Sequence, residues 1–296
     1  MDTKKLNFMQ ELDLTISFLL GMVQGIAEFL PISSTAHIRI LPAFIQLPDV
    51  GAAYTAVIQL GSLVALFVYF RNDLKEFFFA SYEELQNEWK KNDVKNFLLT
   101  IPKWSPKAKM LFYLLMGTIP ISILGVLLKD WIKGPFRSLY VVGGSLIFFA
   151  ILLWISDVFS KRKKTIENIN LWDSLLIGFA QALALIPGAS RSGVTLMAGL
   201  FLQYTRESAM RFSFLLSIPA IALSGFYELI KDWQEIRALG LDSVFVGFTS
   251  AIFFSYIAIA GLLKYLRTHN TFVFVVYRIF LGILIYLLLG LGVIQP

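Results

Sequence analysis

The stretch GMVQGIAEFLPISSTAHIR (residues 21–39) decides how this chain is organised, because it begins as an apolar helix and then breaks. The apolar segment that leads into it, residues 14–27, is shorter than the roughly 17–25 residues that a helix needs to cross a bilayer. Pro31 pushes the residue before it out of helical geometry. We therefore predict a half-helix that enters the membrane and turns back, with its irregular backbone buried in protein or lining a wet cavity.

A second stretch repeats this pattern in the other half of the chain. The apolar residues 174–186 stop at a Pro-Gly pair. The sequence GMVQ (21–24) is echoed by GFAQ (178–181), and PISS (31–34) by PGAS (187–190), with one residue deleted between the blocks. Broken segments at matching places in two halves indicate an inverted repeat with a site near the midplane. The alternative is a chance likeness of two Gly/Pro-rich segments.

Composition supports a membrane protein. Hydrophobic residues make up 57% of the 296 residues and charged residues 16%, against about 25% in soluble domains. We predict an all-α integral membrane protein, a single polytopic domain (1–296) of spanning helices plus two re-entrant half-helix pairs, with inverted halves at about 1–158 and 159–296. The charge-free runs that we expect to span are residues 50–70, 110–128, 138–156, 212–227, 243–263 and 279–296.

The charge distribution predicts an orientation. Eight Lys and Arg residues lie between Phe70 and Met110, and four more lie at 161–164. If both loops are cytoplasmic, that side collects fourteen basic residues against seven outside, and both termini face outward. Topology thus explains the net charge of +6 without a nucleic-acid partner. The absence of cysteine excludes thiol catalysis and Cys-based metal sites.

The first stretch carries reactive side chains. Gln24 and Glu28 share a helix face because they are four residues apart. Ser33 or Ser34 is expected to cap a new helix after the break, whose free N–H groups would form an anion site. His37 follows one turn later on the side of the serines. The alternatives are serines that cap without a ligand and a histidine that only packs.

The second stretch, PGASRSGVT (187–195), again places small hydroxyl residues at a break. Arg191 adds a planar fork that suits phosphate oxygens. A charge at a helix centre in the membrane costs about 2.5–3.5 kcal/mol, so Glu28 and Arg191 must be paired or solvated. A salt bridge that only joins the halves is the alternative. Ser190, Ser192 and Thr195 are the further candidates for binding an anion.

An acid, an imidazole, hydroxyls and an arginine at two helix N-termini suit a phosphate or pyrophosphate, because phosphoryl transfer depends mainly on positioning and charge neutralisation. An enzyme of phosphoryl transfer is therefore the favoured class. A transporter or flippase is the alternative, since such proteins also use inverted repeats. A membrane scaffold would leave the buried ionisable groups unexplained.

The two motifs, residues 24–37 and 187–195, resemble those of the undecaprenyl pyrophosphate phosphatase family, the bacitracin-resistance type of bacterial lipid phosphatase. Weaker matches lie at 57–62, 119–120, 213–219 and 277–278. The resemblance implies hydrolysis of undecaprenyl pyrophosphate, which returns the carrier lipid for cell-wall synthesis. A lipid pyrophosphate phosphatase is then the favoured function, and a transporter or flippase for a phosphorylated polyprenyl lipid is the alternative. It also implies a multi-pass protein of the bacterial plasma membrane whose active site opens to the outer side.

The resemblance implies a divalent cation, Mg²⁺ or Ca²⁺, at Glu28 and more weakly at Gln24, where relatives often carry Glu. Thr55 likewise stands where many relatives have a carboxylate. The expected partners are the polyprenyl pyrophosphate lipid, membrane lipids and a second copy in a homodimer, with no nucleic acid. The residues expected at the site are, as catalytic groups, Glu28, Ser34, His37 and Arg191, and, as substrate-binding groups, Ser33, Ser190, Arg191, Ser192 and Thr195.

The spacing of Ser34 and His37 adds a mechanistic expectation. The two residues lie three apart, about one helical turn, which suits a serine with a histidine as its base. A direct attack by the histidine is the alternative. We expect Ser34 to be the nucleophile or the phosphate anchor.

Overall fold

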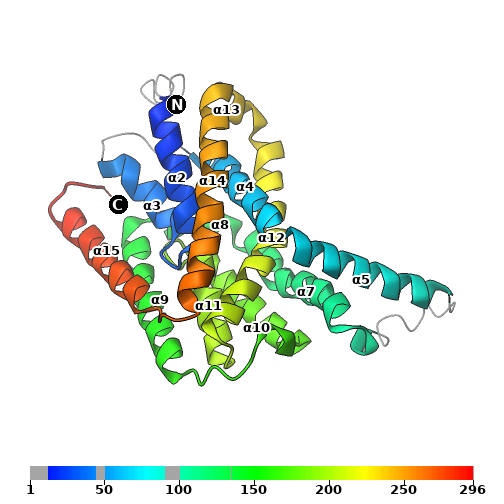
Figure 1. Ribbon diagram of the computed structural model, residues 1–296. Coiled ribbons are helices and arrows are strands. Elements are labelled where there is room, and N and C mark those ends of the chain that lie inside the picture. The colour runs from blue at the N-terminus through cyan, green and yellow to red at the C-terminus, as the bar shows by residue number, and fades with distance from the viewer. Residues whose placement is uncertain (1–12, 45–50, 91–100, 134, 296) are drawn as a thin grey trace.

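The computed structural model describes residues 13–44, 51–90, 101–133 and 135–295, and in this part of the chain the architecture is helical (Figure 1). Within these described residues, five helices are long and apolar enough to cross a membrane, and a sixth candidate span bends by 73° after Tyr69. The spans are α7 (Pro106–Leu127), α9 (Leu139–Phe159), α12 (Arg206–Lys231), α14 (Leu241–Leu266), α15 (Phe272–Gly290) and α4 (Gly51–Tyr69), which bends into α5 (Arg71–Lys90). The prediction of an all-α membrane protein is confirmed.

One predicted span was misplaced. The charge-free run 279–296 predicts a helix that starts after Arg278, whereas α15 starts at Phe272 and ends at Gly290. Arg278 lies inside this helix with its side chain fully buried against the rest of the protein. A charge that faces the protein does not interrupt a span, so the absence of charge was the wrong criterion for this helix.

The two broken segments form helix pairs as predicted. The first pair is α2 (Leu14–Phe29) with α3 (Ser34–Phe44), and the second is α10 (Leu171–Ala182), continued by η5 (Leu183–Leu185), with α11 (Arg191–Phe201). Helices α2 and α10 are too short to span. In Figure 1, α2 enters from the upper edge, while α10 and α11 lie in the lower half of the molecule.

The serines at the two breaks identify equivalent positions. Ser33 and Ser190 each precede the second helix of their pair and have left-handed backbone, with φ of 75° and 68°. Each follows the repeated glutamine, Gln24 or Gln181, by nine residues. The repeat therefore needs no gap, and the deletion inferred from the proline positions was wrong. It follows that Arg191 occupies the position of Ser34 in the other half.

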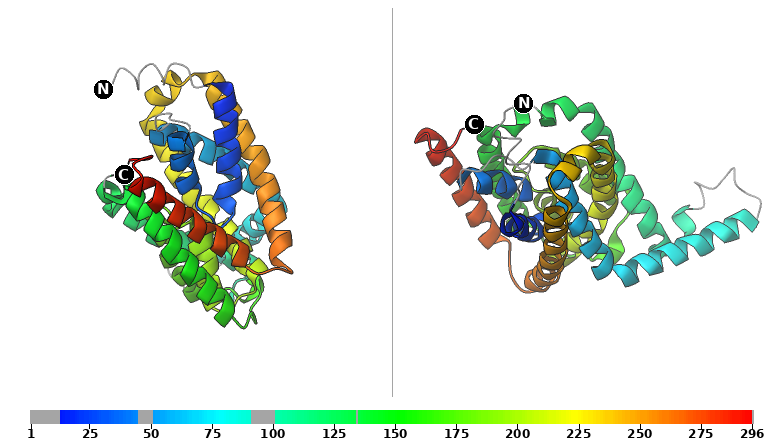
Figure 2. Two further views of the ribbon diagram at one scale, coloured as in Figure 1. Left: turned by 90° about the vertical axis from the view of Figure 1, so that its left-hand side faces the viewer. Right: turned by 90° about the horizontal axis from the view of Figure 1, so that it is seen from above.

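Each short helix packs against a span of the opposite half through paired glycines. A Cβ on Gly21 of α2 would lie 2.2 Å from the carbonyl oxygen of Gly247 in α14. A Cβ on Gly178 of α10 would lie 2.1 Å from the carbonyl oxygen of Gly117 in α7. Only glycine permits such close backbones. Figure 1 shows α2 alongside α14, and α9 and α15 lie side by side in Figure 2. The boundary of the halves at residues 158 and 159 stays a prediction.

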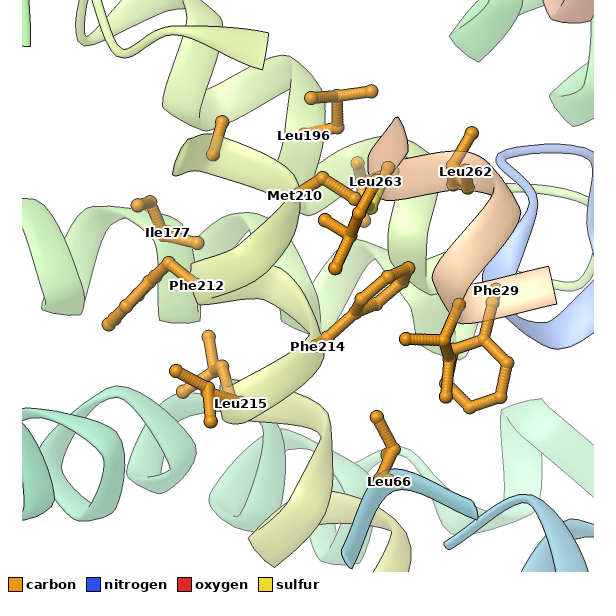
Figure 3. Packing of buried hydrophobic residues seen from close by; sticks show 14 of the residues in the cluster. Phe29, Leu66, Ile177, Leu196, Met210, Phe212, Phe214, Leu215, Leu262 and Leu263 are labelled. Carbon is orange, nitrogen blue, oxygen red and sulfur yellow. The ribbon is translucent and has the colours of Figure 1, made fainter. Parts of the chain in front are cut away.

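The main hydrophobic core surrounds α12 and joins both halves. Figure 3 shows Phe214 of α12 pointing toward Phe29 at the end of α2. The two rings meet edge to face with centroids 5.1 Å apart, the geometry that aromatic pairs prefer. This contact fixes the end of α2 next to the break. The remaining helices are short connections: α8 (Lys129–Lys133), α13 (Trp233–Ala238), η2 (Ile101–Lys103), η3 (Pro135–Arg137) and η4 (Ile166–Asn168).

Candidate active site

A polar pocket lies where the breaks of the two re-entrant pairs meet. The space in it that no atom fills amounts to about 360 Å³, part of it open to solvent. The first break, the second break and α4 all contribute to its wall. The lining residues are Glu28, Ser33, Ser34, Thr35, Gln59, Ala184, Ile186, Gly188, Ser190 and Arg191. The pocket therefore lies between the two halves of the chain, where the repeated broken segments predicted a site.

Among the described residues that line the pocket, Glu28 is the only carboxylate, and it is 7% exposed. Its Oε2 accepts hydrogen bonds from Gln24 Nε2 at 2.9 Å and from Ser34 Oγ at 2.7 Å. Its Oε1 accepts one from Gln59 Nε2 at 3.3 Å. These donors hold the carboxylate at the pocket wall and offset the cost of its burial. Gln24 thus supports Glu28 from behind, because it is not among the lining residues.

Arg191 faces Glu28 across the pocket without a close hydrogen bond. Arg191 Nη2 lies 3.9 Å from Glu28 Oε1, so the charges attract but the pair is not bidentate. Arg191 Nη1 is buried and has no hydrogen-bond partner among the described residues. A buried guanidinium nitrogen without an acceptor is costly, and a phosphate oxygen in the pocket would supply one.

Both second helices present their N-termini to the pocket. The Oγ of Ser33 accepts a hydrogen bond from the amide of Ala36 at 3.4 Å, and the Oγ of Ser190 accepts one from the amide of Gly193 at 3.2 Å. The serines cap α3 and α11, as expected for one of the two candidates in the first motif. The partial positive charge of each helix start then favours an anion between them.

Two predicted binding residues point elsewhere. Ser192 Oγ donates to the carbonyl of Leu30 at 3.0 Å and so joins the two breaks. Thr195 is fully buried, and its Oγ1 donates to the carbonyl of Arg191 at 2.7 Å and also contacts Ser213 Oγ. Neither residue is among those that line the pocket. Their hydroxyls support the second break, and their role in binding substrate stays a prediction.

His37 is engaged away from Ser34. Its Nδ1 lies 2.7 Å from the carbonyl oxygen of Ser33, and its Nε2 lies 2.6 Å from the hydroxyl of Tyr277 in α15. Because a carbonyl can only accept, Nδ1 carries a proton, and in the neutral ring Nε2 accepts from Tyr277. The rings of His37 and Tyr277 also stack, with centroids 5.6 Å apart. In this structure the hydroxyl of Ser34 therefore contacts Glu28 and not the imidazole, contrary to the expected pair.

A buried arginine holds the second break in place. Arg278 Nη2 donates to the carbonyls of Gly188 at 3.0 Å and Ala189 at 2.9 Å. Gly188 has φ of 92°, and a Cβ there would lie 2.5 Å from the carbonyl oxygen of Val142. Gln59, Tyr277 and Arg278 were missed as site residues. The sequence did contain one signal for these three residues, because each is a polar side chain inside a predicted span or next to one.

Fold and pocket together define a multi-pass membrane protein with a polar pocket between two broken helices. Comparison with known families gives a match to "Bacitracin resistance protein BacA" over residues 17–284. The chain belongs to this family.

Its relatives cover nearly the whole chain. A protein of Chloroherpeton thalassium is 41% identical over 293 residues, which are 96% of this chain and 99% of the relative. A protein of Gloeobacter violaceus is 44% identical, covering 96% and 95%, and one of Synechococcus sp. is 45% identical, covering 95% and 96%. All three are named undecaprenyl-diphosphatase, and their names give no support to a transporter.

Proposed function

We propose that this chain is an undecaprenyl-diphosphatase, which hydrolyses undecaprenyl pyrophosphate to undecaprenyl phosphate and phosphate. Its relatives are named for this activity, and the residues of its own pocket are suited to it. The observation that carries the proposal is the meeting of Glu28, Ser34 and Arg191 in one pocket between two helix N-termini. Membership of the bacitracin resistance family agrees with this function.

Arg191 and the two helix starts are suited to bind the pyrophosphate. The free Nη1 of Arg191 would donate to a phosphate oxygen, and the first-turn amides of α3 and α11 would face the same anion. Ser33 and Ser190 act here by capping these helices and lining the pocket. The apolar exterior of the helices leaves the isoprenoid chain in lipid.

We assign the attack on the terminal phosphorus to the hydroxyl of Ser34. Its Oγ would bond to phosphorus while its proton passes to Oε2 of Glu28, 2.7 Å away, and undecaprenyl phosphate leaves. The proton on Glu28 passes to the leaving undecaprenyl phosphate, and water then hydrolyses the phosphoserine, which releases inorganic phosphate and regenerates the hydroxyl. The expectation that His37 is the base stays a prediction, and its contact with Ser33 suits a role in holding the break.

A divalent cation, Mg²⁺ or Ca²⁺, fits this site in one limited way. The described residues contain no cluster of three His, Cys, Asp or Glu side chains that could hold a metal ion. Magnesium often uses one or two carboxylates and completes its shell with water and substrate phosphates. Glu28 and the hydroxyl oxygens of the lining would hold the ion, which would neutralise charge on the pyrophosphate. Gln24 is a poor candidate, because its amide supports Glu28.

We further propose that the protein lies in the bacterial plasma membrane with its pocket open to the outer side. The bias of fourteen basic residues against seven supports this orientation. A homodimer stays a prediction.

Phosphate release by purified protein tests the function. The substrate would be a long-chain isoprenyl pyrophosphate in detergent, with Mg²⁺, with Ca²⁺ and with a chelator. Detergent removes the two compartments that a transporter needs, so turnover there supports an enzyme. Binding of the lipid without any phosphate release, in the presence of either cation, would overturn the proposal.

A further inference from the structure

Helix α5 leaves the bundle and presents an apolar stripe that no described part of the chain covers. It starts directly after α4 at a 73° bend and projects from the bundle with only the beginning of α7 beside it among the described helices (Figures 1 and 2). The side chains of Phe78, Tyr82, Leu85 and Trp89 are between 43% and 78% exposed. Their spacing of four, three and four residues places them on one face of the helix.

A second face of α5 packs against the rest of the protein. Phe77 is buried against the protein, and Ser81 Oγ donates to the carbonyl of Ala108 in α7 at 3.1 Å. Glu84 accepts a hydrogen bond from the amide of Ser105 at 3.0 Å. Glu83 and Asn87 are exposed on a third face, roughly opposite the stripe by the 3.6-residue turn of the helix. Packing on α7 therefore fixes the direction in which the stripe points.

We propose that α5 lies in the plane of the membrane, with the stripe (Phe78, Tyr82, Leu85 and Trp89) inserted at the boundary between lipid headgroups and acyl chains. Spanning helices tilt by about 20° on average from the membrane normal. A helix at 73° to such a span lies closer to the membrane plane than to the normal. The third face, which carries Glu83 and Asn87, then meets water, and Phe79, which is 60% exposed, lies between that face and the stripe.

The side chains of the stripe match this environment. Tyrosine and tryptophan concentrate at membrane interfaces, where the ring is in apolar surroundings and the polar group is wet. The stripe also continues the exposed apolar surface of α4, where Phe67 and Val68 are 46% and 45% exposed just before the bend. Arg71 and Lys75 are exposed near the stripe side of the helix, where long cationic chains can reach lipid phosphates.

A second copy of the chain is the competing occupant. The polar face with Glu83 and Asn87 would tolerate either arrangement, but the continuity of the stripe with the outside of α4 places both surfaces in the same lipid. An interfacial helix buries its apolar face about 5–10 Å into the boundary region. This depth can be measured, and it distinguishes lipid from protein.

The test uses single cysteines, because the chain contains none. Full-length Phe78→Cys, Tyr82→Cys and Leu85→Cys proteins, labelled with an environment-sensitive fluorophore, are reconstituted in phosphatidylcholine–phosphatidylglycerol vesicles. Glu83→Cys and Asn87→Cys are the matched controls. We expect blue-shifted emission and quenching by spin-labelled lipids at the stripe, at a depth of about 5–10 Å. The controls should instead be quenched by aqueous iodide.

An unlabelled measurement guards against perturbed variants. Quenching of tryptophan emission by brominated lipids should fall in Trp89→Phe relative to the native chain, because Trp89 is 78% exposed on the stripe. Equal iodide quenching at stripe and control positions would overturn the proposal. So would protection of the stripe that disappears when the protein is diluted into excess lipid, since that result would identify a second copy as the occupant.

Discussion

The Oγ of Ser34 donates a 2.7 Å hydrogen bond to Oε2 of Glu28, across a break that separates the two residues by one short turn of irregular backbone. Glu28 lies in the last turn of α2 and Ser34 begins α3, so the break itself brings the carboxylate to the hydroxyl. The left-handed backbone of Ser33 supplies the sharp change of direction. A continuous helix would instead place residues six apart on different faces.

Glu28 and Ser34 are expected to act as one unit. Removal of a general base typically costs 10²–10⁴-fold, so Glu28→Gln and Ser34→Ala should each lower kcat by about that range. Groups that act together are strongly non-additive, and the double variant should lose little more. Steady-state phosphate release measures the three losses. Thr249→Ala, an exposed hydroxyl on α14, serves as the control. Losses that multiply would separate the two roles.

His37 and Ser34 are expected to act independently. The imidazole contacts Ser33 and Tyr277, not the Ser34 hydroxyl. The losses in kcat/KM from His37→Ala and Ser34→Ala should therefore multiply in the double variant. A double-mutant cycle on purified protein checks this. Non-additive losses would mean that substrate draws the imidazole onto Ser34, as the spacing in the sequence suggests.

Glu28 and Arg191 are expected to have separate functions. Their charged atoms lie 3.9 Å apart and Arg191 Nη1 is free of protein partners in the described chain. The charge-swapped variant Glu28→Arg/Arg191→Glu should stay inactive, because the carboxylate serves the chemistry and the guanidinium binds phosphate. Activity of the swap is compared with that of each single variant. Substantial recovery would return the pair to a structural salt bridge.

Gly178 is expected to be essential for packing. Alanine there would place its Cβ 2.1 Å from a backbone oxygen of Gly117, so α10 and α7 would have to separate. Overpacking of this kind costs about 1–3 kcal/mol. Gly261→Ala on α14 is the matched control, since a Cβ there has nothing within 4 Å. Thermal unfolding in detergent should show a lower midpoint for Gly178→Ala and no loss for the control.

The orientation can be read by labelling. A cysteine at Lys90, on the basic segment between α4 and α7, should be inaccessible to an impermeant reagent outside intact cells. A cysteine at Leu291, just after α15, should be accessible. Reversed labelling of the two positions would invert the proposed topology.

Sequence patterns predicted the parts of the fold that local chemistry determines. Helix α2 ends two residues before Pro31, and Ser33 and Ser190 cap the helices that follow. The proline positions misled the alignment, because Pro31 and Pro187 lie at different distances from the capping serines. The capping serine with left-handed backbone is the common element, and backbone angles are not visible in a sequence.

Contacts between distant segments set the rest of the site. Tyr277 contacts the imidazole of His37, which lies 240 residues away in the sequence. Arg278 donates to the carbonyl of Gly188, which lies 90 residues away. Gln59 donates a hydrogen bond to Glu28 from α4, a span in which Gln59 is the only side-chain amide. No periodicity encodes these partners, so the neighbours of the catalytic candidates had to come from the structure.

The paired glycines have a consequence for assembly of the chain during synthesis. Helix α2 leaves the ribosome early, yet the surface that receives Gly21 belongs to α14, more than two hundred residues later. Until α14 is inserted, the glycine face of α2 lacks its final partner. The glycine face of α7 likewise lacks its partner until α10 is inserted. Each half therefore packs its short helix against a span of the other half. Neither half can reach its final packing before the other is inserted, so a truncated chain would keep both glycine faces open to lipid and to quality-control proteases.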